Sequence, residues 1–266
     1  MSAYLEARLV SARHPGAEAD AVRDVSLSVQ AGEIVALIGA NGSGKSTLIS
    51  ALGGGLKPRQ GKVRLGNRDL YKLRERARAR ALARLPQSPM APSGLRVVDL
   101  VATGRYAWRS SFAGLSRDDR RAISNGLLAV GMEDLRTRNL NHLSGGERRR
   151  AWIAMVLTQQ TPLMLLDEPT AALDARHQLE VLAHLAEINR DRGTSMIVAL
   201  HDLSQAAALA HRVAVMVRGR LYAVGRPAEV LTPETLRDAF GVEAEIQSQP
   251  RFRVSIHGVA DPKRFL

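Results

Sequence analysis

An α/β fold with a mainly parallel sheet is predicted by three features of this 266-residue chain. Short apolar runs that suit buried strands alternate with longer stretches of helical period, as in parallel α/β proteins. A glycine-rich loop follows the first continuous apolar run, and a pair of carboxylates follows a later one. A mostly helical middle interrupts the alternation, so we expect it to form an inserted subdomain.

The N-terminal part predicts strands on both sides of the glycine-rich loop. Val25, Leu27 and Val29 alternate with polar residues as in a half-buried strand, whereas residues 34–38 form a continuous apolar run. Residues 62–65, followed by Gly66-Asn67, predict an edge strand and a turn.

Five arginines follow, at alternate positions for the most part: Arg74, Arg76, Arg78, Arg80 and Arg84. Alternate residues spread around a helix and form no single stripe. We therefore favour a solvated helix over a polyanion-binding face.

The C-terminal half returns to strands after a helical stretch over 118–158. Buried strands are predicted over 163–166 and 196–200, with a hairpin about Arg218-Gly219-Arg220. We expect one domain over 1–266, made of a core (1–86 and 163–240), a helical subdomain (87–162) and a C-terminal tail (241–266).

Composition limits the function classes. The chain has no cysteine, which excludes a disulfide framework and a cysteine-based zinc site. No signal-peptide pattern and no run of 18 apolar residues is present, so we expect a cytosolic chain without a membrane span. The net charge of +12 fits contact with nucleic acid or an anionic membrane, or else a site for a polyanionic nucleotide in an arginine-rich chain.

Residues 39–47 read GANGSGKST and fit the phosphate-binding pattern G-x-x-x-x-G-K-[ST]. Glycines let several backbone N–H groups converge on one anion, and the following helix adds its positive end. The lysine can reach the β- and γ-phosphates, and the next hydroxyl can ligate Mg²⁺. A chance glycine-rich turn is the alternative, which the flanking strand and helix disfavour. The candidate nucleotide-binding residues are Gly39, Asn41, Gly42, Ser43, Gly44, Lys45, Ser46 and Thr47.

Asp167 and Glu168 end the apolar run 163–166. Ligand sites of α/β sheets lie at the carboxyl ends of strands. Asp167 is suited to hold Mg²⁺ through water and so to complement Ser46, and Glu168 can orient or deprotonate the attacking water. A surface acidic turn after a core strand is the alternative interpretation.

Residues 143–147, LSGGE, resemble the LSGGQ signature of ATP-binding-cassette ATPases. Ser144 can cap a helix whose positive end points at an anion. The order of the motifs also matches this family: phosphate loop, Gln87, LSGGE, Asp167-Glu168, ALD at 172–174, and His201. The resemblance covers essentially the whole chain. It implies a P-loop NTPase (RecA-like) core with an antiparallel β subdomain and an inserted helical subdomain.

The resemblance also implies roles for single residues, with ATP and Mg²⁺ as cofactors. Two copies are expected to meet head to tail, so that the signature of one copy (Ser144, Gly145, Gly146, Glu147) closes on the γ-phosphate held by Lys45 of the other. Gln87 is expected to contact Mg²⁺ and to sense a membrane partner, and His201 to contact the γ-phosphate. Asp174 is expected to cross the dimer interface, and Glu168 to act as general base.

One position departs from the family pattern. Where such ATPases usually stack an aromatic side chain on adenine, this chain places His14. A histidine ring can stack less strongly, and a loop histidine without this role is an equal alternative.

Several stretches, 98–106, 150–157, 173–178 and 201–206, resemble ATPases of ferric-siderophore importers, with haem and cobalamin importers as alternatives. Haem ATPases often carry a longer segment between the signature helix and the acidic strand than this chain does. The resemblance implies a location at the cytoplasmic face of the cell membrane. Its implied partners are a second copy, permease subunits and, indirectly, a periplasmic or surface substrate-binding protein.

Two other classes fit less well. A nucleic-acid-linked ATPase of this family is a remote alternative, because the chain has one cassette and no zinc module; no nucleic-acid partner is expected. A GTPase is disfavoured because no Asn-Lys-x-Asp motif is present.

Overall fold

The computed structural model describes residues 4–109, 114–247 and 252–260. The chain divides into two compact units, one made of the residues up to 72 together with those from 195 onward, the other of residues 73–194. Parts of the expected tail, residues 248–251 and 261–266, lie outside the described residues.

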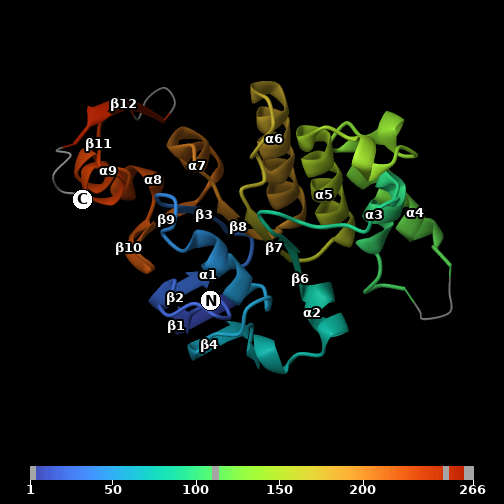
Figure 1. Cartoon of the computed structure of the whole chain (residues 1–266), viewed down its shortest axis with the longest axis horizontal. Helices are drawn as coiled ribbons and strands as arrows, with labels where there is room; N and C mark the ends of the chain where they lie inside the picture. Colours follow the sequence, from blue (N-terminus) through green and yellow to red (C-terminus); the bar gives the residue numbers. More distant parts are fainter. Residues whose placement is uncertain (1–3, 110–113, 248–251, 261–266) are drawn as a thin grey trace. The chain divides into compact units, whose positions relative to one another are not determined.

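The first unit contains an antiparallel sheet in the order β2-β1-β4-β5, drawn in blue and cyan in Figure 1. Its strands are β1 (Leu5–Ala12), β2 (Val22–Val29), β4 (Gln60–Leu65) and β5 (Arg68–Asp69). Val25, Leu27 and Val29 point into the core, as predicted. The prediction of an edge strand at 62–65 was wrong, because the two-residue β5 pairs with the outer side of β4.

A parallel group of strands forms the centre of the same unit. β3 (Ile34–Ile38) is buried at every residue and pairs in parallel with β8 (Ser195–Ala199) on one side and β9 (Arg212–Val217) on the other. Residues on both faces of such a strand are covered, which explains its continuous apolar run. The predicted hairpin is confirmed: β10 (Arg220–Gly225) runs antiparallel to β9.

The remaining elements of the first unit are short. They are α1 (Lys45–Leu52), the 3₁₀ turn η1 (Leu70–Lys72), α7 (Leu203–Leu209), α8 (Pro227–Val230) and α9 (Pro233–Phe240). The described part of the expected tail is a hairpin of β11 (Val242–Gln247) and β12 (Arg253–Val259). Arg237 of α9 holds Glu243 of β11 in a two-point ion pair at 2.8 and 2.9 Å.

The second unit pairs two parallel strands with a group of helices. β6 (Leu82–Leu85) runs parallel to β7 (Leu163–Asp167), with Leu82 opposite Leu163 and Leu85 opposite Leu166. The solvated helix predicted for the arginine-rich segment is α2 (Glu75–Ala81), which buries no residue. Arg84 lies outside this helix. It belongs to β6, where pairing with β7 holds the chain in an extended conformation.

Three helices of the second unit pack together (Figure 1). They are α3 (Val97–Thr103), α4 (Arg117–Leu128) and α5 (Gly145–Gln159), with the 3₁₀ turns η2 (Glu133–Leu135) and η3 (Leu140–His142) between the last two. Gly126 permits the contact of α4 with α5, since a Cβ there would lie 2.9 Å from the carbonyl oxygen of Ala154. The long helix α6 (Ala175–Arg192) follows β7.

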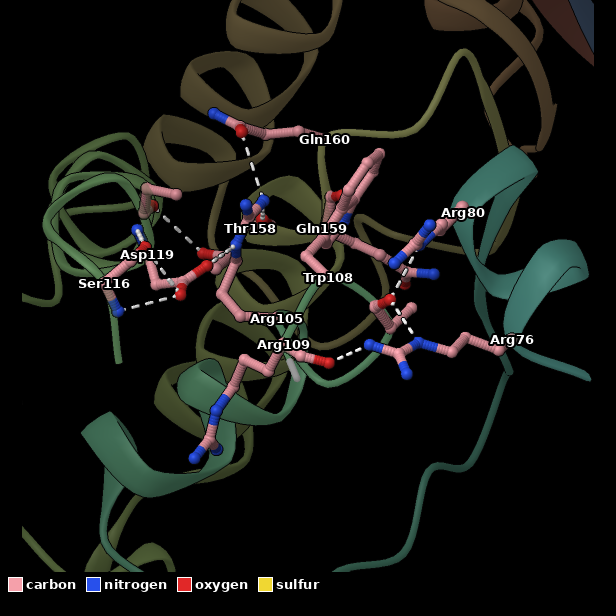
Figure 2. A network of polar contacts seen from close by, with 12 residues as sticks. Arg76, Arg80, Arg105, Trp108, Arg109, Ser116, Asp119, Thr158, Gln159 and Gln160 are labelled. Carbon is pink, nitrogen blue, oxygen red and sulfur yellow. Dashed lines mark hydrogen bonds and ion pairs between the residues drawn. The ribbon is translucent and has the colours of Figure 1, made fainter. Parts of the chain in front are cut away.

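A polar network joins the C-terminal end of α5 to its neighbours (Figure 2). Arg105 donates through Nε to Asp119 at 2.7 Å and through Nη1 to the Thr158 carbonyl at 3.1 Å. Trp108 donates through Nε1 to the Gln159 carbonyl at 2.8 Å, and the Arg105 guanidinium lies 5.3 Å from the centroid of the Trp108 ring. These contacts hold the connection after α3 against the end of α5.

The helices of the described residues include none that is both long enough and apolar enough to cross a bilayer.

Candidate nucleotide-binding and hydrolysis site

The predicted phosphate loop connects β3 to α1 in the first unit. Gly39 and Gly44 adopt φ angles of +154° and +100°, which side chains disfavour. Any Cβ at Gly39 would also clash, since it would lie 2.6 Å from Ser43 Oγ. Gly44 occupies the N-cap of α1 and supplies no side-chain hydrogen bond. The first-turn N–H groups of α1 therefore have no side-chain cap among the described residues, which suits a phosphate.

Lys45 is already oriented within this loop. Its side chain is buried, and Nζ donates to the carbonyl oxygens of Gly39 at 2.8 Å and Ala40 at 3.2 Å. The ammonium is thus held against the backbone at the start of the loop. A cation preorganised in this way loses little side-chain entropy when it binds a phosphate.

A cavity of about 460 Å³ adjoins the phosphate loop. Its walls come from loop residues 40–43, the turn between β9 and β10, and Arg237 and Asp238 of α9. The C-terminal helix α9 therefore takes part in the surroundings of the loop, which the sequence pattern did not indicate.

Both candidate histidines lie in the first unit. His14 is exposed after β1, and its Nε2 lies 2.9 Å from the hydroxyl oxygen of Thr47 in α1. This contact places the ring beside the helix that follows the phosphate loop. His201 is exposed and follows Leu200, directly beyond the carboxyl end of β8.

The two candidate carboxylates lie at the end of β7 in the second unit. Asp167 is the last residue of the strand, and both it and Glu168 are buried. Glu168 has a φ of +52°, although it is not a glycine and precedes Pro169. Residues before proline prefer extended conformations, so this backbone conformation needs support from its surroundings.

The signature segment begins α5 as a capping box. Ser144 Oγ accepts from the Glu147 N–H at 3.2 Å, and the Glu147 carboxylate accepts from the Ser144 N–H at 2.8 Å. That second hydrogen bond is the main reason why the pKa of Glu147 lies below its usual range. A glutamate in the fifth signature position therefore has a structural role. At Gly145 a Cβ would meet no atom within 4 Å, so an anion can approach the backbone here.

Asp174 and Gln87 also lie in the second unit, Asp174 at the start of α6 and Gln87 in the loop after β6. Asp174 caps α6 by accepting from the His177 N–H at 2.9 Å, and this bond, with a second one from the His177 ring, lowers its pKa. Gln87 is exposed two residues beyond β6. A small cavity of about 200 Å³ is lined by Gln87, Gly145 and Trp152 among others, so the Gln87 loop and the start of α5 lie close together.

Sequence reasoning missed Arg149, a buried side chain of the second unit's site. Its guanidinium donates to main-chain carbonyls of the Gln87 loop and of the Asp167-Glu168 segment. Three consecutive arginines, 148–150, follow the signature, and nothing in the sequence distinguishes the buried one.

The structure thus places the predicted residues in two groups. The first unit holds the phosphate loop, His14 and His201, and the second holds Gln87, the signature, Asp167, Glu168 and Asp174.

Comparisons with known proteins identify the family of the chain. Residues 22–171 match the model of the ABC transporter family. The chain is 41% identical over 230 residues to "Iron(3+)-hydroxamate import ATP-binding protein FhuC" of Bacillus subtilis, covering 86% of each chain. It is 43% identical over 233 residues to "Hemin import ATP-binding protein HmuV" of Thermobifida fusca, covering 88% of this chain and 81% of that one.

Solved structures agree with this result. A chain of an ABC transporter in an inward-facing conformation superposes with a TM-score of 0.80 at 25% identity, covering 98% of this chain and 99% of that one. The predicted fold class is confirmed, with strands in parallel around β3 and a separate antiparallel sheet. The chain therefore belongs to the ATP-binding-cassette ATPases of the ABC transporter family.

Proposed function

We propose that this chain is the ATP-hydrolysing subunit of an importer that takes up ferric siderophores. The observation that carries the substrate class is the 41% identity to an iron(3+)-hydroxamate import subunit over 86% of both chains. The connection between α5 and β7 also favours a siderophore over haem. Haem ATPases often carry a longer segment at this place, and here only residues 160–162 separate the two elements.

The phosphate loop supplies the nucleotide end of this proposal. The uncapped first turn of α1 and the buried Lys45 fit the charge and the hydrogen-bonding needs of a triphosphate. Hard oxygen ligands suit Mg²⁺, and we assign it to the Ser46 hydroxyl, the Gln87 amide oxygen and, through water, the Asp167 carboxylate. His14 is proposed to lie against the adenine.

The chemistry of hydrolysis is assigned to residues of this chain and of a second copy. Glu168 accepts a proton from the attacking water, and His201 donates a hydrogen bond to the γ-phosphate. Ser144, Gly145 and Gly146 of the second copy complete the site through the open start of α5. Asp174 crosses between the two copies. When bound, Mg²⁺ neutralises charge on the phosphates.

Partners follow from the same proposal. Two copies bind permease subunits at the cytoplasmic face of the membrane, and a substrate-binding protein acts on the permease from the other side. Nucleic acid has no role in this proposal.

Haem is the second candidate substrate, because the chain is 43% identical to a hemin import subunit over 88% of its length. The solute does not touch the ATPase subunit, so sequence identity to this subunit separates the two substrates weakly. Uptake in cells decides between them. Deletion of the gene should abolish uptake of radioiron supplied as a ferric hydroxamate and leave use of haem intact; the reverse pattern would replace the siderophore by haem.

The ATPase proposal is tested on the purified chain. Glu168→Gln should bind ATP but accumulate as an ATP-bound dimer in sedimentation velocity, with little turnover, because the amide cannot accept the proton. Glu133→Gln, on the partly exposed 3₁₀ turn η2, is the matched control and should hydrolyse ATP like the wild type. Wild-type turnover by Glu168→Gln would remove Glu168 from catalysis.

A further inference from the structure

Arg149 is a buried cation whose partners are main-chain oxygens. It lies on α5 and is 7% exposed. Nη1 donates to the carbonyl oxygens of Pro86 at 3.0 Å and Gln87 at 2.9 Å. Nη2 donates to the carbonyl oxygens of Asp167 and, at 2.7 Å, of Glu168. One planar guanidinium thus joins the loop after β6 to the end of β7, which a flexible ammonium reproduces poorly.

The Glu168 carbonyl belongs to a backbone that needs such support. A φ of +52° before a proline is unfavourable and persists only where neighbouring groups impose it. The hydrogen bond from Nη2 is one of those constraints. Because φ and ψ of Glu168 set the direction of its Cα–Cβ bond, the same constraint directs its carboxylate.

The other end of α5 holds the start of β6. Gln159 donates through Nε2 to the carbonyl oxygens of Ala79 at 2.6 Å and Leu82 at 3.2 Å. Its own carbonyl accepts from Trp108, and both residues are labelled in Figure 2. Arg149 holds the residues just beyond the other end of β6. β6 is therefore attached to α5 near both of its ends. The side chain of Arg149 thus connects α5 to the backbone of both Gln87 and Glu168.

Packing alone does not require a charged side chain at position 149. The residue is only 7% exposed, so its guanidinium is largely removed from water. A neutral side chain of similar volume avoids the cost of desolvation. A buried cation is consistent with a role that a neutral residue cannot fill.

We propose that Arg149 is a positioning residue for hydrolysis: it holds the Glu168 backbone so that the carboxylate faces the attacking water, and it ties this orientation to the signature helix. The proposal rests on the assignment of Glu168 as general base. Arg149 itself contacts neither nucleotide nor water in this scheme.

The first test measures ATP hydrolysis by the full-length chain with Arg149→Gln, Arg149→Lys and the control Arg150→Gln. Arg150 is on the same helix, and within the part of the chain that the structure describes it donates to one carbonyl, that of Val130, at 3.3 Å. Arg149→Gln should lower kcat about ten- to a hundredfold, the loss typical of a misplaced catalytic group, with KM for ATP within about twofold. Arg149→Lys should lie between it and the wild type, and Arg150→Gln should match the wild type.

The second test separates positioning from folding. In the Glu168→Gln background, Arg149→Gln should lower the residual turnover much less than it lowers that of the wild type, because most of its effect acts through Glu168. The fraction of ATP-bound dimer in sedimentation velocity should also be unchanged. A loss of turnover as large as in the wild-type background, or loss of the dimer, would overturn the proposal in favour of a purely structural role. A wild-type kcat for Arg149→Gln would overturn it as well.

Failure of this inference and failure of the proposed function are distinct. If the wild type does not hydrolyse ATP and Glu168→Gln traps no dimer, the ATPase assignment fails. If the wild type hydrolyses ATP and Arg149→Gln equals it, only the role of Arg149 fails.

Discussion

Arg105 and Asp119 form an ion pair at 2.7 Å whose side chains are only 9% and 7% exposed. Asp119 is also the third residue of α4 and closes a capping box with Ser116. Burial raises the pKa of Asp119, but hydrogen bonds from Arg105 and Ser116 outweigh burial and hold the pKa below its usual range. This pair joins the segment after α3 to the start of α4, and through Thr158 to the end of α5.

We expect Asp119→Ala to destabilise the protein by about 3–5 kcal/mol, because it leaves a buried guanidinium without its carboxylate. Urea denaturation followed by circular dichroism measures the loss. Glu133→Ala removes the exposed partner of Arg136 and should cost no more than about 1 kcal/mol. Equal costs for the two variants would show that the buried pair contributes nothing beyond a surface pair.

The pH dependence of this stabilisation follows from the direction of the pKa shift. The folded pKa of Asp119 is lower than the unfolded one, so the unfolded state binds the proton more tightly. The contribution is therefore complete above the unfolded pKa and is lost as the pH falls through the folded value. The stability gap between wild type and Asp119→Asn should narrow from about pH 5 downward, given an unfolded pKa of about 3.9. A gap that widens in acid would contradict this assignment.

Two capping boxes of the same kind permit a matched comparison. Ser116 begins α4 and Ser144 begins α5, each with a reciprocal bond to the third helical residue. Replacing either serine by alanine should lower stability by about 1 kcal/mol, the usual cost of an N-cap. Only Ser144→Ala should also reduce ATP hydrolysis, since only that cap is assigned to the nucleotide. Loss of activity in both variants would show that Ser144→Ala acts only by destabilising its helix.

A bulky residue at the same signature position should separate binding from hydrolysis. Ser144→Arg should leave ATP binding by the monomer within about twofold of wild type, because Lys45 and the phosphate loop belong to the other unit. Hydrolysis should be abolished, because the second copy can no longer close on the γ-phosphate. Binding of a fluorescent ATP analogue and phosphate release measure the two effects. Hydrolysis that survives would contradict a site shared between two copies.

The contact between His14 and Thr47 leads to a test of adenine stacking. His14→Phe keeps a ring and loses the bond to Thr47, whereas Thr47→Val loses the bond and keeps the imidazole. If the ring stacks, His14→Ala should weaken ATP binding about fivefold or more and His14→Phe should not, since a stacked base contributes on the order of 1–3 kcal/mol. Binding of a fluorescent ATP analogue measures both. Weakening by His14→Phe and Thr47→Val alike would assign the effect to the hydrogen bond.

Local rules made much of the fold and of the candidate site predictable. The phosphate loop between β3 and α1 and the capping box of Ser144 depend on residues within a few positions of one another. Glycine conformations, helix caps and the apolar run of β3 are properties of short segments, and the sequence displays them directly. The assignment of the family followed from the order of such segments.

The tertiary structure decided which of several equivalent side chains is used. Arg148, Arg149 and Arg150 are identical in type and adjacent, but successive residues on a helix point about 100° apart, so only packing selects the one that reaches the β6 and β7 carbonyls. The partners of Arg149 lie 18 to 63 positions away. Contacts of this range depend on how β6, β7 and α5 meet, and no local pattern encodes that meeting.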